Sequence, residues 1–249
     1  MARMTNKKRA QTNKQLWEKA NSSHRQRWQV LSQKGYDFYL NEQLTKEEVD
    51  NLNEAGMPTF TINRITPIVE IMKYFVTANN PRWKAVGATG DDVDVAQVHS
   101  DIADYCWYHS NGKSIYSQVV LDSLTKGIGY FMIDVDRDAD RGMGEVEFKR
   151  IDPYDVYVDP ASRDFLFRDA NFISVRKNVS KSQLMNLFPE FSRKIKNVSG
   201  GSDNMSYSQR PSTDYQSIQP EDITMGVNIE AEDDSIIPYY ETYSKKKHA

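Results

Sequence analysis

The stretch IDVDRDADRGMGEVEF, residues 133–148, has the residue types and the spacing of a calcium-binding loop. Acidic residues stand at alternate positions, and a glutamate follows where the loop of an EF-hand has its bidentate ligand. The candidate ligands are Asp134, Asp136, Asp138, Asp140 and Glu145. Since Ca²⁺ takes oxygen ligands, a calcium site is the first chemistry that the sequence suggests.

Two features of the same stretch favour a β-hairpin turn instead. The sixth position of an EF-hand loop requires glycine for a sharp turn, and this sequence has Ala139 there. The flanking runs YFMI and EVEF consist of strand-forming residues, so strands rather than helices would hold the ends of the loop. We therefore predict a hairpin tip without a metal site, and a calcium-binding interaction module is the alternative.

A second metal hypothesis concerns His99, Cys106 and His109, which fall on one side of a predicted helix. His99 and Cys106 would lie ~10 Å apart along the helix axis, too far to share one ion. Cys106 and His109 alone do not make a structural zinc site. We predict that these residues flank the core.

Three aspartates in IDPYDVYVDP, residues 151–160, form a further carboxylate cluster. If Asp152, Asp155 and Asp159 converged with a lysine, they would suit a metal-dependent nuclease. Their alternation and the neighbouring prolines favour turn and capping roles, because Asp before Pro promotes turns. The sequence also has no Walker-type glycine-rich motif, HExxH or GxSxG. We predict no catalytic residue, no enzyme and no cofactor, with the nuclease as an alternative.

Composition limits the class of protein further. The chain has 249 residues, of which 39% are hydrophobic, and a formal net charge of −3, which excludes a generally basic nucleic-acid-binding surface. No apolar run approaches the roughly 20 residues that span a bilayer, so we expect a soluble protein made in the cytoplasm. Fourteen tyrosines and four tryptophans are typical of surfaces that meet other proteins.

The first part of the chain has helical periodicity. We expect residues 1–14 to be a flexible basic arm, followed by one helix with an aromatic stripe from Trp17 to Leu31 that ends at Gly35. A capping box of Thr45 and Glu48 predicts a short helix, and TFTIN predicts a strand. We expect the next helix to begin with Thr66 as N-cap and to bury four residues: Ile68, Met72, Phe75 and Val76.

The second part changes from helices to strands. A helix from about Asp92, with Val95, Val98, Ile102 and Tyr105 on one face, ends at Asn111-Gly112, and a second ends at Gly127. A hairpin, two strand-like runs, a helix at 180–188 and a final strand, IIPYYETY, follow. The fold class is α+β, with helices packed on short antiparallel strands and hairpins. Because that strand leads directly into the end of the sequence, we expect the chain to be the N-terminal part of a longer protein.

Short motifs occur in a characteristic order along residues 15–190. They include AGMPTFTINRITPIVE, ANNPRW, DSLTKGIGYFMIDVD and SKSQLMNLFP. The positions concerned are Pro58, Asn63, Arg64, Asn80, Pro81, Gly127, Gly129, Asp159, Pro160, Asp169, Ala170, Phe188 and Pro189. This series resembles the N-terminal half of the portal proteins of tailed bacteriophages, especially the type found in short-tailed phages. It departs from that family at Asn79-Asn80-Pro81-Arg82, where Asn-Arg-Pro is more usual, and residues 197–235 have no match.

The resemblance implies a homo-oligomeric ring, a dodecamer, at one vertex of the virion capsid. A separate terminase would drive double-stranded DNA through this ring during packaging, and the DNA would later be ejected through the same ring. Tail or adaptor proteins would attach below, as at a head-tail connector, and would retain the DNA. Major capsid and scaffold proteins would be further partners, and no membrane would be involved.

The resemblance and the composition together predict how the chain is divided. The resemblance implies that residues 15–196 form a wing-like domain and that residues 236–249 are a strand returning to the core and leading to stem and clip regions. Residues 197–235 are rich in Ser, Asn, Asp, Gln and Gly, and this composition predicts a polar mobile segment. Trp17, Trp28 and Arg64 are the candidates for contacts with another subunit or the capsid. The residues that touch DNA are not assigned.

Overall fold

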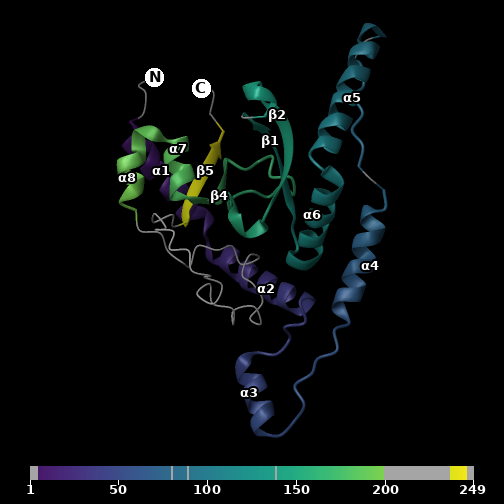
Figure 1. Ribbon diagram of the computed structural model, residues 1–249, viewed down its shortest axis with the longest axis vertical. Helices are drawn as coiled ribbons and strands as arrows, with labels where there is room; N and C mark the ends of the chain where they lie inside the picture. The colour runs from purple at the N-terminus through teal and green to yellow at the C-terminus, as the bar shows by residue number, and fades with distance from the viewer. Residues whose placement is uncertain (1–4, 80, 89, 138, 199–235, 246–249) are drawn as a thin grey trace, which may run out of the picture. The chain divides into compact units, whose positions relative to one another are not determined.

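The computed structural model describes residues 5–79, 81–88, 90–137, 139–198 and 236–245 (Figure 1). The chain separates into two compact units. One unit comprises Met1–Arg27 and Tyr154–Ala249, and the other comprises Trp28–Pro153. The predicted mobile segment lies almost wholly outside the described residues.

The discontinuous unit, Met1–Arg27 with Tyr154–Ala249, is built on an antiparallel sheet in the order β3-β4-β5. Its strands are β3 (Val156–Val158), β4 (Phe172–Ser180) and β5 (Ile236–Ser244). Its helices are α1 (Asn6–Ala20), α7 (Lys181–Leu187) and α8 (Ser192–Lys196). Ala20 of α1 packs with Tyr157 and Phe172 of the sheet, so two distant stretches of sequence share one core.

The continuous unit, Trp28–Pro153, contains a group of helices and one hairpin. The helices are α2 (Ser23–Tyr39, which begins in the other unit), α3 (Lys46–Glu54), α4 (Ile65–Thr77), α5 (Val93–His109) and α6 (Gly112–Lys126). The hairpin pairs β1 (Tyr130–Asp136) with β2 (Glu145–Ile151). Figure 1 shows α4 beside the lower part of α6.

An aromatic cluster joins the helices of this unit to its hairpin. The ring centroids of Trp83 and Trp107 lie 4.8 Å apart, and each lies 5.5 Å from the ring of Phe148 on β2. The chain turns from α5 into α6 at Gly112, where a Cβ atom would come within 2.2 Å of the Trp107 ring. Glycine is therefore required where the chain passes over this cluster.

Several predicted elements are confirmed. The capping box of Thr45 and Glu48 opens α3, and Gly127 ends α6 in the left-handed conformation. The predicted hairpin is present, as are strands β3 and β4, the helix capped by Ser180, and the final strand. That strand pairs with β4, upstream in the sequence, so it has a partner within the chain.

The predicted N-terminal helix is instead two helices. Residues 6–14, part of the predicted flexible basic arm, belong to α1, which Thr5 caps at its start. The break falls at Asn21 and Ser22, residue types that favour helix ends because their side chains bond to the backbone. Gly35 does not end α2. A Cβ atom there would lie 2.8 Å from the carbonyl oxygen of Thr125, so the glycine allows close packing on α6.

The predicted strand at TFTIN is wrong, and so is the predicted cap of the helix that follows. Residues 59–63 form no strand, because no described strand lies alongside to complete a ladder. The backbone N–H groups of Ile65 and Thr66 donate to Asn63 Oδ1 at 2.9 and 3.1 Å. Asn63, rather than Thr66, therefore satisfies the start of α4.

Candidate functional site

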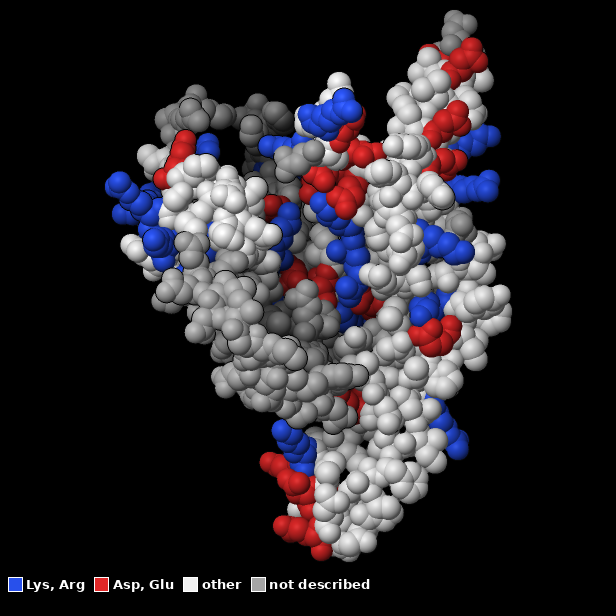
Figure 2. Space-filling view, viewed as in Figure 1, with Lys and Arg blue, Asp and Glu red and all other residues white. Residues whose placement is uncertain are grey.

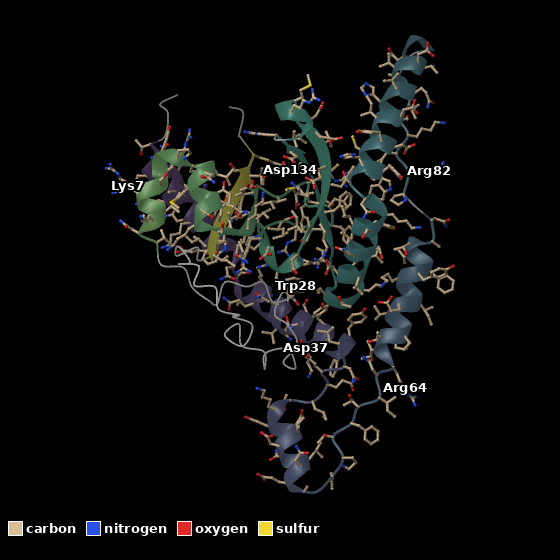
Figure 3. All side chains as sticks on the ribbon, in the orientation of Figure 1. Lys7, Trp28, Asp37, Arg64, Arg82 and Asp134 are labelled. Atoms are coloured by element: carbon tan, nitrogen blue, oxygen red, sulfur yellow. The ribbon has the colours of Figure 1, made fainter. Side chains whose placement is uncertain are left out.

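The acidic stretch forms the end of the β1–β2 hairpin (Figure 3). Asp134 lies opposite Glu147, and Asp136 lies opposite Glu145. The flanks are thus strands rather than the two helices of an EF-hand, as the hairpin interpretation predicted. Asp138 lies outside the described residues, and among the described ones no group of three or more His, Cys, Asp or Glu side chains could hold a metal ion.

The like charges on the hairpin are partly balanced by a lysine. Lys149 Nζ lies 2.8 Å from Glu147 Oε2, and this hydrogen bond raises the pKa of Lys149. Opposed carboxylates on neighbouring strands repel each other, so one neighbouring cation offsets only part of the cost.

The residues of the zinc hypothesis are used separately. Cys106 is buried on the inner side of α5, whereas His99 and His109 are exposed. His109 Nε2 lies 3.1 Å from Glu145 Oε2, and the hydroxyl of Tyr105 donates to Glu145 Oε1 at 3.0 Å. His109 therefore pairs with a carboxylate of the hairpin, beside a cavity of 260 Å³, and not with Cys106.

The three aspartates of the nuclease hypothesis each have a different cation. Asp152 lies 3.2 Å from Lys126 Nζ, whereas Asp155 pairs with Arg176 at 2.7 Å in the other unit. Asp159 pairs with Lys19 at 3.1 Å. The three aspartates therefore belong to separate ion pairs and share no cation in these contacts.

Asp159 organises the start of a loop in the discontinuous unit. Burial would raise the pKa of its carboxyl, but bonds from the Asn171 side chain, the Ala161 N–H and Lys19 outweigh this and lower the pKa to about 2. Asp169 accepts hydrogen bonds from the Arg163 N–H and the Ser162 hydroxyl. The aspartates of the Asp-Pro and Asp-Ala motifs at 159–160 and 169–170 therefore stabilise the same loop through hydrogen bonds.

A buried charge network in the continuous unit was not predicted from the sequence. Lys126, whose side chain has no exposed surface, lies 3.0 Å from Asp122 and 3.2 Å from Asp152. Arg150 binds Asp122 through two nitrogens at 2.5 and 2.7 Å. The Trp28 indole N–H donates to the Lys126 carbonyl at 3.1 Å, so α2, α6 and the end of β2 are held together. The only sequence signal was the spacing of Asp122 and Lys126 on one helix face.

Helix α4 turns its polar residues toward its own unit. The Tyr39 hydroxyl donates to Glu70 at 2.6 Å, and Glu70 also pairs with Lys73 at 2.5 Å. The bonds to Lys73 and Tyr39 lower the pKa of Glu70, while burial and the bond to Glu70 raise that of Tyr39 to about 12. Thr66 donates to the carbonyl of Tyr39. Polar contacts therefore attach this helix to α2.

Most apolar residues of α4 are exposed, including all four that were predicted to be buried, which corrects that prediction. We call this set the α4 outer face: Ile65, Ile68, Ile71, Met72, Tyr74, Phe75 and Val76. Periodicity identified which residues share a face, but not which face the chain itself covers. Figure 2 is largely white over α4, consistent with a surface that has few charges.

Helix α5 has the same arrangement on a smaller scale. The predicted stripe is present, and all four of its residues are exposed: Val95, Val98, Ile102 and Tyr105. The opposite side carries small residues such as Ala96, Ser100 and Ala103, which are half-buried. The Ser100 hydroxyl accepts a hydrogen bond from the Ala85 N–H at 3.0 Å. The side of α5 with small and polar residues therefore faces its own unit, as in α4.

Of the predicted contact residues, the two tryptophans pack within the chain. Trp17 lies against Tyr157 and Tyr240, with ring centroids 5.8 and 5.4 Å apart, and Trp28 is half-buried near Lys126. Arg64 is exposed at the start of α4 (Figure 3). Contacts of these residues with another subunit stay a prediction.

The family of the chain is shown by comparison with known protein families. The model of the phage P22-like portal protein family matches residues 15–249. The chain belongs to this family. A search among curated proteins found no match.

Membership confirms the resemblance inferred from the motifs and agrees with the α+β fold. It implies a phage capsid component that takes part in a ring assembly, in a family whose role is structural. Among the described residues, no helix combines the length and the apolar composition needed to cross a bilayer.

Proposed function

We propose that this chain is a subunit of a dodecameric ring at one vertex of the phage capsid, through which DNA is packaged and later ejected. The observation that carries the proposal is the family match over residues 15–249. The exposed apolar faces of α4 and α5 support it, because a subunit of a permanent assembly has surfaces that its neighbours complete.

The proposed partners follow from that position. Major capsid and scaffold proteins contact the outside of the ring, a separate terminase drives double-stranded DNA through the channel, and tail or adaptor proteins bind below. The subunit itself carries out no catalysis and needs no cofactor. We assign residues 15–196 to the wing part of such a subunit.

The proposal is tested by the assembly state of the full-length protein. Light scattering should give the mass of a closed ring, and negative-stain electron microscopy should show particles with a central channel. A protein that stays monomeric at micromolar concentration, with scaffold protein present as well as without it, would contradict the proposal. Magnesium-dependent nuclease activity would favour the first alternative function, and a rise in thermal stability with calcium would favour the calcium-binding module.

A further inference from the structure

The polarity of α4 is inverted relative to an ordinary surface helix. Its only charged residues, Glu70 and Lys73, engage each other and Tyr39 on the inner side. On the outer side, Ile68 is 58% and Phe75 71% exposed. A surface helix normally presents its polar residues to water, so this arrangement indicates a face that another molecule covers.

The size and composition of this face suit a permanent protein contact. The seven residues of the α4 outer face expose on the order of 800 Å², which is what one partner contributes to an interface of standard size. The face has aromatic residues and a methionine but no charge. Such depletion of charge is typical of the centre of an interface, and no basic residue is present to favour an anionic lipid surface.

A ring requires a second, different surface on the same chain. In a cyclic assembly with more than two members, each contact joins two unlike patches, one from each neighbour. The hairpin offers such a patch on β1, where Phe131, Ile133 and Val135 occupy alternate positions and are all exposed. Val146 of β2 lies opposite Val135 and extends this apolar face.

We propose that the α4 outer face of one subunit packs on the β1 face of the neighbouring subunit, with a second copy of this chain as its partner. The inference rests on the proposed ring and identifies the two surfaces through which neighbouring subunits contact each other. Packing the apolar side of a helix on the apolar face of a sheet is common in proteins, because it removes both apolar surfaces from water. The ion pair of Arg150 on β2 with Asp122 on α6 attaches the hairpin that carries this face to a helix of its own unit.

The first experiment introduces charge into the face in the full-length protein, as the double substitution Ile71→Lys and Phe75→Lys. The concentration at which half of the protein is assembled, measured by light scattering, should rise about a hundredfold. The melting temperature of the dilute monomer should not fall, because both positions already face water. Leu187→Lys, at an exposed position of α7 in the other unit, is the matched control and should assemble normally.

The second experiment tests the pairing of the two faces by disulfide formation. The chain has a single cysteine, Cys106, which is buried. Disulfides that form in the variants can therefore be attributed to the introduced cysteines. The variant with Phe75→Cys and Ile133→Cys should form covalent oligomers up to the ring under mild oxidation. Each single variant, and the pair Leu187→Cys with Ile133→Cys, should give none of these.

The outcomes separate the inference from the proposed function. If the parent forms rings and the lysine variant forms them equally well, the inference is wrong and the portal function stands. If the parent forms no ring, the proposed function itself fails. A lower melting temperature of the monomeric lysine variant would show that the chain covers this face itself, and normal rings that no longer enter capsids would identify the capsid protein as the partner. Either result overturns the inference.

Discussion

The network around Lys126 and the acidic hairpin use the same kinds of residue in the same unit, with opposite consequences. In the network, Asp122 and Asp152 are buried, and Lys126 and Arg150 lie between them. On the hairpin, Asp134 and Asp136 face other carboxylates across the strands. A carboxylate therefore contributes to stability here according to its burial and its partner, and not according to how many acids surround it.

The largest expected effect comes from removing the central cation of the network. Lys126→Met keeps the apolar stem but leaves Asp122 and Asp152 buried, with Arg150 as a shared partner. Because loss of one member of a buried ion pair costs about 3–5 kcal/mol, we expect the free energy of unfolding to fall by about 3 kcal/mol. Urea unfolding followed by tryptophan fluorescence measures this, since Trp28 bonds to the backbone of Lys126.

Two further variants make that experiment specific to the network. Lys113→Met, at an exposed position of the same helix, should change the free energy of unfolding by less than about 0.5 kcal/mol. Adding Asp152→Asn to Lys126→Met removes one buried negative charge that has lost its lysine partner. The double variant should recover part of the lost free energy of unfolding. Equal effects of Lys126→Met and Lys113→Met would show that the network does not stabilise the fold.

A smaller effect, with a defined pH dependence, is expected at Asp159. Its pKa is lowered from 3.8 to about 2, and its side chain has no exposed surface. The unfolded state therefore binds the proton more readily, so the stabilisation is present above about pH 4 and is lost as the pH falls toward 2. Asp159→Asn should cost about 2 kcal/mol at neutral pH.

The measurement is the difference in melting temperature between the parent and Asp159→Asn as the pH is lowered. The difference should be largest at neutral pH and should shrink toward zero near pH 2. Glu190→Gln, at an exposed position of the same unit, is the control and should show no such trend. A difference that stays constant with pH would mean that the charge of Asp159 does not stabilise the unit.

The smallest effect is expected on the hairpin. Asp136→Asn with Asp138→Asn removes two negative charges from a stretch in which Asp136 lies opposite Glu145, and we expect the loss of this repulsion to alter stability by less than about 0.5 kcal/mol. The double variant should melt at or slightly above the parent temperature, and millimolar calcium should leave the parent almost unchanged. A bound calcium ion would instead stabilise the parent by about 2.7 kcal/mol at a hundredfold excess over its dissociation constant. A rise of several degrees with calcium, lost in the variant, would restore the metal site.

Local signals in the sequence determined many elements and the family. The capping box at Thr45, the glycine that ends α6 and the strand-forming flanks of the hairpin each depend on residues a few positions apart. Such short-range preferences act in the same way in any chain, so they can be recognised without the fold. The order of the short motifs likewise predicted the portal family, which the family match confirms.

Only the tertiary structure decided what each face and each charge meets. Lys19 pairs with Asp159, and Lys126 with Asp152, across separations of 140 and 26 residues that no local pattern encodes. The period of α4 showed that Ile68, Met72 and Phe75 share a face, yet these residues point outward. A helical period specifies which residues lie together, whereas burial depends on what the rest of the chain, or a neighbouring subunit, places against them.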